Sequence, residues 1–190
     1  MRQLWILAGG NGAGKSKFYE TYLKVRNLSF VNADQLAKEI SDEQSAEVSK
    51  AAQTQAMDAC VQKIINGETF CFETVFSHES KLELIKKAKS NGYQVVLVFI
   101  HLDSPERNIA RVFQRVENGG HNVPYDRIKN RISRALENLK KAIPLVDKVA
   151  LVDNSSTEDP LKMVAKISDC KVTEQVNPLP KWAAEIINSI

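Results

Sequence analysis

The feature of this sequence that most constrains its fold is a glycine-rich segment near the N-terminus, Gly9-Gly10-Asn11-Gly12-Ala13-Gly14-Lys15-Ser16. It matches the pattern G-x4-G-K-[ST] of phosphate-binding loops in full. A short apolar run at 4–8 precedes it, and a helical pattern from 14 to about 26 follows it. Such a loop works between a buried strand and a helix, because its N–H groups and the helix N-terminus must converge on one anion. The segment therefore predicts an α/β fold as well as a phosphate site.

Apolar runs alternate with helical patterns along the rest of the chain. Further strands are expected at 30–31, 70–72, 93–102 and 149–152, and helices at 35–66 (with a break near 41–42), 79–90, 104–117 and 124–142. We expect 158–168 to be helical, 170–176 to form an edge strand, and a last helix to begin at Lys181. This alternation predicts a three-layer α/β/α fold of the P-loop NTPase type, with a mainly parallel sheet of five to six strands. Residues 1–190 are expected to form one domain, with 118–142 as a small helical lid or substrate segment.

Bulk properties exclude several classes of protein. The three cysteines lack metal-ligand spacing and predict neither a disulfide framework nor a zinc site. No apolar stretch approaches the roughly 20 residues that span a bilayer, so we expect no membrane partner and a cytoplasmic protein. The net charge of +3 is too small to favour nucleic acid as a partner.

The residue types in the glycine-rich loop indicate how it would hold ATP or GTP. Its glycines let the backbone wrap closely around phosphate oxygens, so all eight residues from Gly9 to Ser16 are assigned to nucleotide binding. Lys15 is expected to bridge the β- and γ-phosphates, and the hydroxyl of Ser16 to ligate Mg²⁺.

Acidic residues follow the predicted strands at the edge where open α/β sheets bind ligands: Asp34, Glu73, Asp103 and Asp153. Phosphoryl transfer needs a base beside the acceptor hydroxyl and an acidic group that helps to hold Mg²⁺ or its waters. Asp34 and Glu73 are the best placed, since they are expected to flank the first strand. The alternatives are an N-cap for Asp34 and a surface turn for Glu73. Asp103 is better interpreted as a helix cap, and Asp153-Asn154 as either an adenine-pocket wall or a plain turn.

Arginines at helical spacing are expected to border the site. Arg111 and Arg115 share one helix face, and a second set with spacings of four and three lies beside an apolar stripe: Arg127, Arg131 and Arg134. Guanidinium groups can clamp phosphate bidentately and stabilise transferring charge. Arg115 and Arg134 are the favoured catalytic arginines, and the alternative for the whole set is a solvated face with surface salt bridges.

Three histidines complete the candidates. His121 follows two glycines in a hinge or substrate loop, and His78 lies just past the third predicted strand. Both are candidate substrate contacts, with surface positions as the alternative. His101 lies in a core strand and is expected to be structural.

Five local patterns make the chain resemble the zeta-toxin group of P-loop kinases. They are the loop at 9–16, Val-Asn-Ala-Asp at 31–34, Phe-Glu-Thr at 72–74, Arg115 with Gly-Gly-His-Asn-Val-Pro at 119–124, and the stretch from Arg127 through Arg131, Arg134, Asn138 and Leu139 to Asp153-Asn154-Ser155. Together they span about residues 3–156. The Gly-Gly-His-x-Val-Pro element with its spaced arginines is more specific than the phosphate loop.

The resemblance implies a kinase that uses ATP or GTP with Mg²⁺ and phosphorylates a sugar-nucleotide hydroxyl, typically on UDP-N-acetylglucosamine. It implies that Asp34 is the general base, that Glu73 binds substrate or metal, and that Arg115 with Arg131 or Arg134 contacts the γ-phosphate. With the two histidines proposed above from their positions, the residues assigned to substrate binding are Glu73, His78, His121 and Arg131. The expected partners are a nucleoside triphosphate and a small-molecule acceptor. An antitoxin partner is compatible with the resemblance, but no residue pattern indicates one.

Three rival hypotheses stay open. The chain is compatible with a P-loop kinase for another acceptor, such as a nucleoside, an antibiotic or a polynucleotide end. It is also compatible with a regulatory module that binds nucleotide without catalysis. A nucleic-acid-associated ATPase would need a continuous basic face, which the small net charge does not favour.

Overall fold

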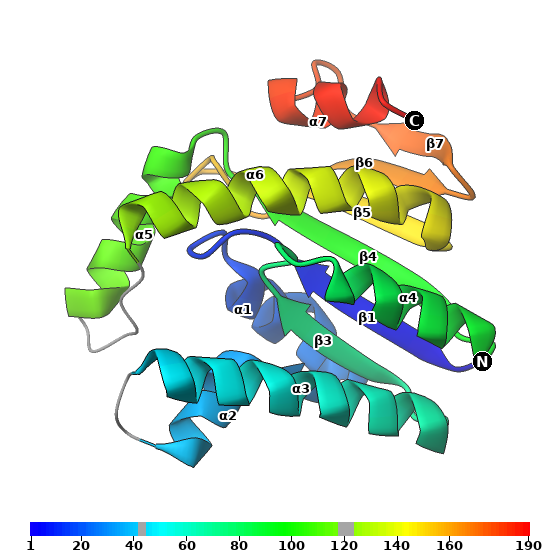
Figure 1. Cartoon of the computed structure of the whole chain (residues 1–190). Helices are drawn as coiled ribbons and strands as arrows, with labels where there is room; N and C mark the ends of the chain where they lie inside the picture. Colours follow the sequence, from blue (N-terminus) through cyan, green and yellow to red (C-terminus); the bar gives the residue numbers. More distant parts are fainter. Residues whose placement is uncertain (42–44, 118–123) are drawn as a thin grey trace.

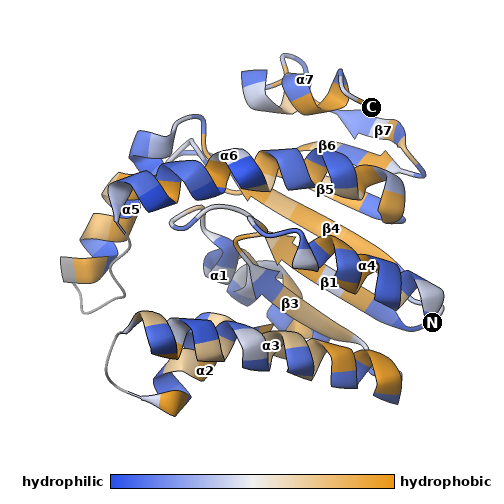
Figure 2. Ribbon diagram, in the orientation of Figure 1, coloured by the Kyte–Doolittle hydropathy of each residue, from blue (hydrophilic) through white to orange (hydrophobic). Residues whose placement is uncertain are grey.

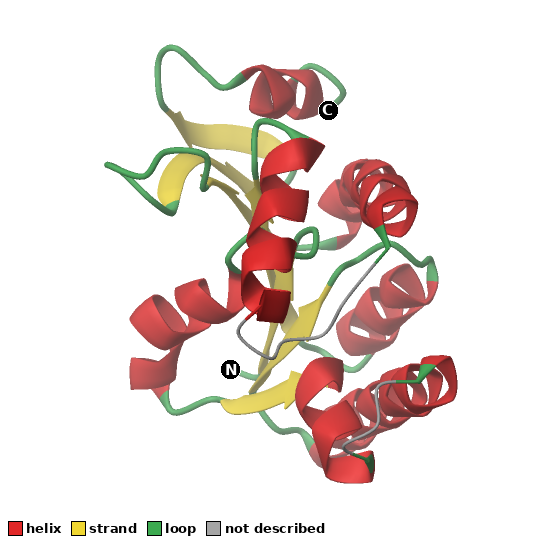
Figure 3. Ribbon diagram, turned by 90° about the vertical axis from the view of Figure 1, so that its left-hand side faces the viewer, coloured by secondary structure: helices red, strands yellow, loops and turns green. Residues whose placement is uncertain are grey.

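The computed structural model describes residues 1–41, 45–117 and 124–190. Within these ranges a seven-stranded sheet runs through the molecule and carries helices on both faces (Figures 1 and 3). Its strands lie in the spatial order β2-β3-β1-β4-β5-β6-β7. In chain order they are β1 (Gln3–Ala8), β2 (Ser29–Asn32), β3 (Phe70–Thr74), β4 (Gln94–His101), β5 (Lys148–Asp153), β6 (Lys162–Ser168) and β7 (Lys171–Gln175). The α/β fold with a mostly parallel sheet is confirmed.

The helices connect these strands largely where the sequence predicts them. They are α1 (Lys15–Phe18), which continues through a π-helical segment (Tyr19–Leu23) and a 3-10 turn (Lys24–Arg26), α2 (Ala33–Ile40), α3 (Ala46–Asn66), α4 (Ser80–Ser90), α5 (Pro105–Glu117), α6 (Tyr125–Ala142), a 3-10 turn (Ile143–Leu145) and α7 (Lys181–Ile187). No helix in the described part of the chain is long and apolar enough to cross a bilayer.

The parallel strands form the most apolar part of the molecule (Figure 2). β1 pairs in parallel with β3 on one side and β4 on the other, and β2 and β5 extend the parallel set. The larger core cluster packs α3, α4, α6 and α7 on one face, and a smaller cluster packs α1 and the turns after it on the other. Covered on both faces, these strands are apolar almost throughout, as parallel strands usually are.

The predicted helix at 158–168 is wrong, because β6 occupies Lys162–Ser168. This strand pairs antiparallel with β5 and then with β7. Its core-facing residues are the buried Val164, Ala165 and Ile167. Pairing with the open edge of β5 satisfies backbone groups that a helix there would leave unpaired. The extra strand raises the sheet from the predicted five or six strands to seven.

The helices α5 and α6 border the carboxyl edge of the parallel strands. Ile109 and Val112 of α5 pack against Ile128 and Ile132 of α6 in a separate small cluster. Further along α6 the buried residues belong to the main core: Ala135, Leu139 and Ala142. Within the candidate lid segment 118–142, the second half of α6 is therefore fixed to the sheet, and residues 118–123 lie outside the described residues.

Candidate active site

The glycine-rich loop lies where β1 ends and α1 begins, at the carboxyl edge of the sheet. The backbone N–H of Ala13 donates to Gly10 O over 3.1 Å and closes the loop. Gly9 adopts φ 145°, and a Cβ there would stand 2.2 Å from Ile100 O on β4. The loop can therefore lie against β4 only because this position has no side chain.

Lys15 is buried at the start of α1, with 8% of its surface exposed. Its Nζ donates to Gly10 O over 3.1 Å and lies 3.9 Å from Glu73 Oε1. Burial lowers the pKa of Lys15, and the carboxylates of Glu73 and Asp34 oppose that effect. The ammonium group thus lies inside the loop that is expected to hold phosphate.

Glu73 belongs to β3 and is buried, so the alternative of a surface turn is wrong. Its Oε2 accepts a hydrogen bond of 3.2 Å from the hydroxyl of Ser16. Burial raises the pKa of Glu73, whereas Lys15 and the Ser16 hydroxyl act in the opposite direction. The two oxygen-bearing side chains fit Mg²⁺, which takes few protein ligands when substrate phosphates supply the others. In the described residues no cluster of three metal-binding side chains occurs.

Asp34 lies in the first turn of α2 and is exposed. The N-cap of that helix is Asn32, whose Oδ1 accepts from the N–H of Asp34 over 2.7 Å and of Gln35 over 3.4 Å. The alternative that Asp34 is the cap is therefore wrong. In the described part of the chain its carboxylate makes no hydrogen bond or ion pair, yet it acts electrostatically on Lys15, Glu73 and Arg131.

Two of the predicted arginines are close enough to the loop to lower the pKa of Lys15, namely Arg115 on α5 and Arg131 on α6. Burial has the largest effect on the pKa of Arg131 and lowers it. The neighbouring charge of Arg127 lowers this pKa further, whereas the carboxylate of Asp34 raises it. Arg134 is exposed and its Nε donates to Asn130 O of its own helix over 3.4 Å. A contact of Arg134 with phosphate stays a prediction.

Other candidates have structural contacts. The Trp182 indole N–H donates to Asp153 Oδ2 over 2.6 Å, and Asp103 pairs with Arg107 over 2.8 Å. His78 is exposed, and its Nδ1 accepts from the N–H of Ser80 over 3.2 Å where α4 begins. His101 is buried in β4 as expected. His121 lies outside the described residues, so its substrate contact stays a prediction.

Sequence reasoning missed the residues that support the loop from behind. Asn108 on α5 and Asn154 after β5 are both buried, and the carboxamide of each donates to a backbone carbonyl of the loop. Asn154 is therefore not simply a turn residue. Neither position carries a local signal for supporting the loop, because the contacts join residues about 100 or more positions apart.

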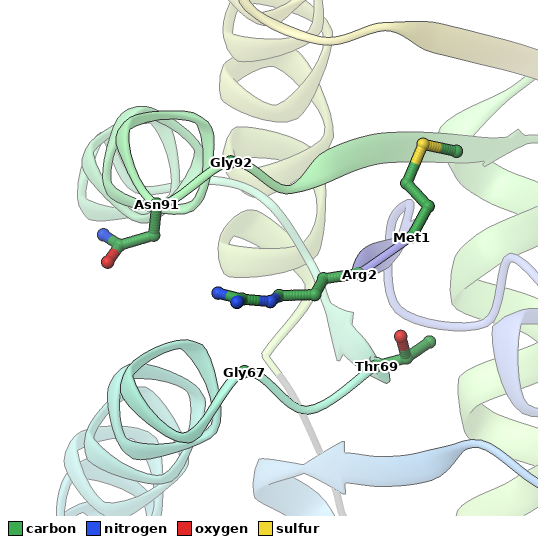
Figure 4. A pocket seen from close by; sticks show the side chains of 6 residues that line it. All are labelled: Met1, Arg2, Gly67, Thr69, Asn91 and Gly92. Carbon is green, nitrogen blue, oxygen red and sulfur yellow. The ribbon is translucent and has the colours of Figure 1, made fainter.

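A separate pocket of about 610 Å³ lies at the opposite edge of the sheet (Figure 4). The residues around it precede β1, β3 and β4: Met1, Arg2, Gly67, Thr69, Asn91 and Gly92. In Figure 4 Arg2 extends between the C-terminal ends of α3 and α4. This is the usual place for a cation that complements helix dipoles. The pocket is remote from the loop and forms no part of the site.

Comparisons with known proteins agree with this arrangement. The model of the zeta toxin family matches residues 2–159. An uncharacterized protein of Haemophilus influenzae is 28% identical over 140 residues, which cover 68% of this chain and 97% of that protein.

Two solved structures share the fold. A chain in the crystal structure of AvrRxo1-ORF1 and AvrRxo1-ORF2 with ATP has a TM-score of 0.71 and 19% identity, covering 98% of this chain. The present chain spans only 64% of the length of that one. A chain from the PezAT chromosomal toxin–antitoxin system of Streptococcus pneumoniae has a TM-score of 0.67 and 15% identity, covering 100% of this chain and 85% of that one.

The family match includes the loop, the strand ends that carry Asp34 and Glu73, and both helices that carry the arginines. It leaves out only the last part of the sheet and α7. The chain belongs to the zeta toxin family.

Proposed function

We propose that the protein is a kinase that transfers the γ-phosphoryl group of ATP or GTP to a hydroxyl of a small molecule. The observation that carries this proposal is the convergence of charged groups on the loop. Glu73 Oε1 lies 3.9 Å from Lys15 Nζ and its Oε2 accepts from the Ser16 hydroxyl, and Asp34, Arg115 and Arg131 are close enough to act on the pKa of Lys15. A loop that only bound nucleotide would need no exposed carboxylate opposite the phosphates. The family match and the fold shared with an ATP-bound structure support the first part of the proposal, that the protein binds a nucleoside triphosphate.

The donor side would work through groups that are already fixed. Lys15 would bridge the β- and γ-phosphates, and Ser16 with Glu73 would hold Mg²⁺ directly or through its waters. Bound Mg²⁺ neutralises charge on the phosphate oxygens. Arg115 and Arg131 would face the transferred group from the acceptor side, where their positive charge would stabilise the transition state.

On the acceptor side Asp34 would accept the proton of the attacking hydroxyl. An exposed carboxylate that no described residue binds is suited to this, because its lone pairs are available to the substrate. The leading acceptor is a sugar nucleotide such as UDP-N-acetylglucosamine, which rests on the family resemblance alone. His78 and His121 are the further candidate contacts for it.

A panel of acceptors tests the substrate class. ADP or GDP release would be measured with UDP-N-acetylglucosamine, nucleosides, an aminoglycoside and an oligonucleotide with a free 5′ hydroxyl. We expect release only with the sugar nucleotide, together with a phosphorylated product by mass spectrometry. Product from another acceptor alone would replace the sugar nucleotide but keep the kinase.

Substitution of the base tests catalysis itself. Asp34→Asn keeps the shape of the side chain but removes its basicity, so turnover should fall by roughly 100- to 10,000-fold while the Kd for ATP stays unchanged. Asp58→Asn on the exposed face of α3 is the matched control and should retain full turnover. Unchanged turnover in Asp34→Asn would contradict the assignment. Nucleotide binding without turnover by the wild type would favour the regulatory module.

A further inference from the structure

Two buried carboxamides from outside the glycine-rich segment hold the phosphate loop. Asn108 on α5 has 1% of its surface exposed, and its Nδ2 donates to Asn11 O over 2.7 Å. Asn154 after β5 has 4% exposed, and its Nδ2 donates to Ala13 O over 2.7 Å. Burying an amide is unfavourable unless it finds partners, so two such groups on one short loop call for an explanation.

The geometry of the peptide bond links these contacts to anion binding. In a trans peptide the carbonyl of one residue and the N–H of the next point in opposite directions. Fixing Asn11 O toward Asn108 therefore aims the N–H of Gly12 away from α5. In the same way, fixing Ala13 O toward Asn154 aims the N–H of Gly14 away from Asn154. The third carbonyl, Gly10 O, accepts from Ala13 N and Lys15 Nζ, each over 3.1 Å.

Asn154 is itself held by three further hydrogen bonds. The Oδ1 of Asn154 accepts from Leu161 N over 3.1 Å, its N–H donates to His101 O over 2.9 Å, and its carbonyl accepts from Arg111 over 2.9 Å. Its Nδ2 would stand 2.3 Å from a Cβ at position 14, which adopts φ 102°. This contact gives a reason for glycine there beyond the backbone angle.

Asn108 packs against the loop with its backbone as well. Its carbonyl oxygen would lie 2.6 Å from a Cβ at Gly12, and its Nδ2 would lie 3.1 Å from one at Gly10. It stands seven residues before Arg115, so both project from a similar side of α5. The helix that supports the loop therefore also carries the arginine that acts on Lys15.

We propose that Asn108 and Asn154 are positioning residues for nucleoside triphosphate binding, each aiming one N–H group of the loop at the phosphates. This inference rests on the proposed nucleotide site. Neither side chain needs to touch the nucleotide. Asn108 acts through Gly12 and Asn154 acts through Gly14.

The test uses Asn108→Leu and Asn154→Leu, which keep the approximate size of the side chain and remove its donor. Each should raise the Kd for MgATP about tenfold or more, measured by calorimetry. Amide resonances of the ATP complex give a residue-specific signature. The amide resonance of Gly12 should shift in the Asn108 variant, and the amide resonance of Gly14 should shift in the Asn154 variant.

Asn138→Leu is the matched control. Asn138 is also buried, and its Nδ2 donates to the Phe76 carbonyl over 2.9 Å, outside the loop. We expect it to lower the melting temperature without changing the Kd for MgATP. An unchanged Kd in both loop variants, or an equal rise in the Asn138 variant, would overturn the inference. Alanine variants serve the same comparison if a leucine variant does not fold. Failure of the wild type to bind MgATP would instead contradict the proposed function.

Discussion

The phosphate loop and the residues around the expected acceptor meet at the carboxyl edge of the sheet, but their polar groups are used differently. On the loop side Lys15, Glu73, Asn108 and Asn154 are buried, and each has a protein partner at hydrogen-bond or ion-pair distance. On the opposite side Asp34, Arg115 and Arg134 are exposed, and Arg131 is half-buried.

This difference indicates whether the polar groups of each side are ordered when the protein folds or when a ligand binds. The loop side is organised by folding, so its N–H groups are in place before a nucleotide arrives. The acceptor side leaves more of its charged surface exposed to water, and a ligand must desolvate this surface on binding. Substitutions on the loop side should therefore change nucleotide affinity, and those on the acceptor side should change turnover.

The strongest test of this contrast is Lys15→Met. It removes the buried ammonium group from the centre of the donor side, so we expect transfer to fall about 1,000-fold. The Kd for MgATP should rise as well, unlike that of Asp34→Asn. Both are measured with the acceptor identified in the panel.

Lys17→Met, an exposed lysine two residues further along α1, is the control and should leave both quantities unchanged. Loss of turnover in Lys15→Met with an unchanged Kd would mean that Lys15 acts only in the transition state. The proposed division between the two sides would then be incorrect.

A second test concerns His101 at the end of β4, the strand against which the loop packs. His101 is buried beside Trp182, with 4.9 Å between ring centroids, and follows the residue whose carbonyl abuts Gly9. Burial lowers the pKa of His101 to about 4, against an opposing effect of Asp153 and Asp103. The folded state thus favours the neutral ring. Its contribution to stability is complete above the unfolded pKa of about 6.5 and is lost as the pH falls through about 4.

The contribution of His101 to the free energy of unfolding should fall by about 3 kcal/mol between pH 7 and pH 4. Urea unfolding at pH 7 and pH 4 measures it as the difference between wild type and His101→Leu, whose stability should depend less on pH. His78→Gln, at an exposed histidine, should keep the wild-type dependence. Equal pH dependence in wild type and His101→Leu would show that the ring is not held neutral.

The loop and the parallel strands could be predicted because their signals are local. The glycine pattern fixes residues 9–16, and continuous apolar runs indicate β1 and β4. The β6 strand was missed for a physical reason. Its conformation depends on the open edge of β5, which no local pattern in Lys162–Ser168 reveals.

The candidate site shows the same limit. Asp34 was a candidate base or a cap, and only the structure shows that Asn32 takes the capping role. Asn108 and Asn154 had no signal for supporting the loop, since a carboxamide in a helix or a turn acquires that role only through distant contacts. Residue types that carry chemistry can be listed from sequence, but the side chains that position them cannot.

The smallest expected effect separates two arginines of α6. Arg131 is half-buried and acts on Lys15, whereas Arg134 is exposed and its Nε donates to its own helix. Lysine keeps the charge but loses the bidentate geometry of guanidinium. We therefore expect Arg131→Lys to reduce turnover about tenfold and Arg134→Lys to leave it nearly unchanged, both with an unaltered Kd for MgATP. The reverse ranking would assign the phosphate contact to Arg134, whose exposed side chain would then have to reorient when the acceptor binds. The acceptor side would in that case be even less organised by folding than its exposure indicates.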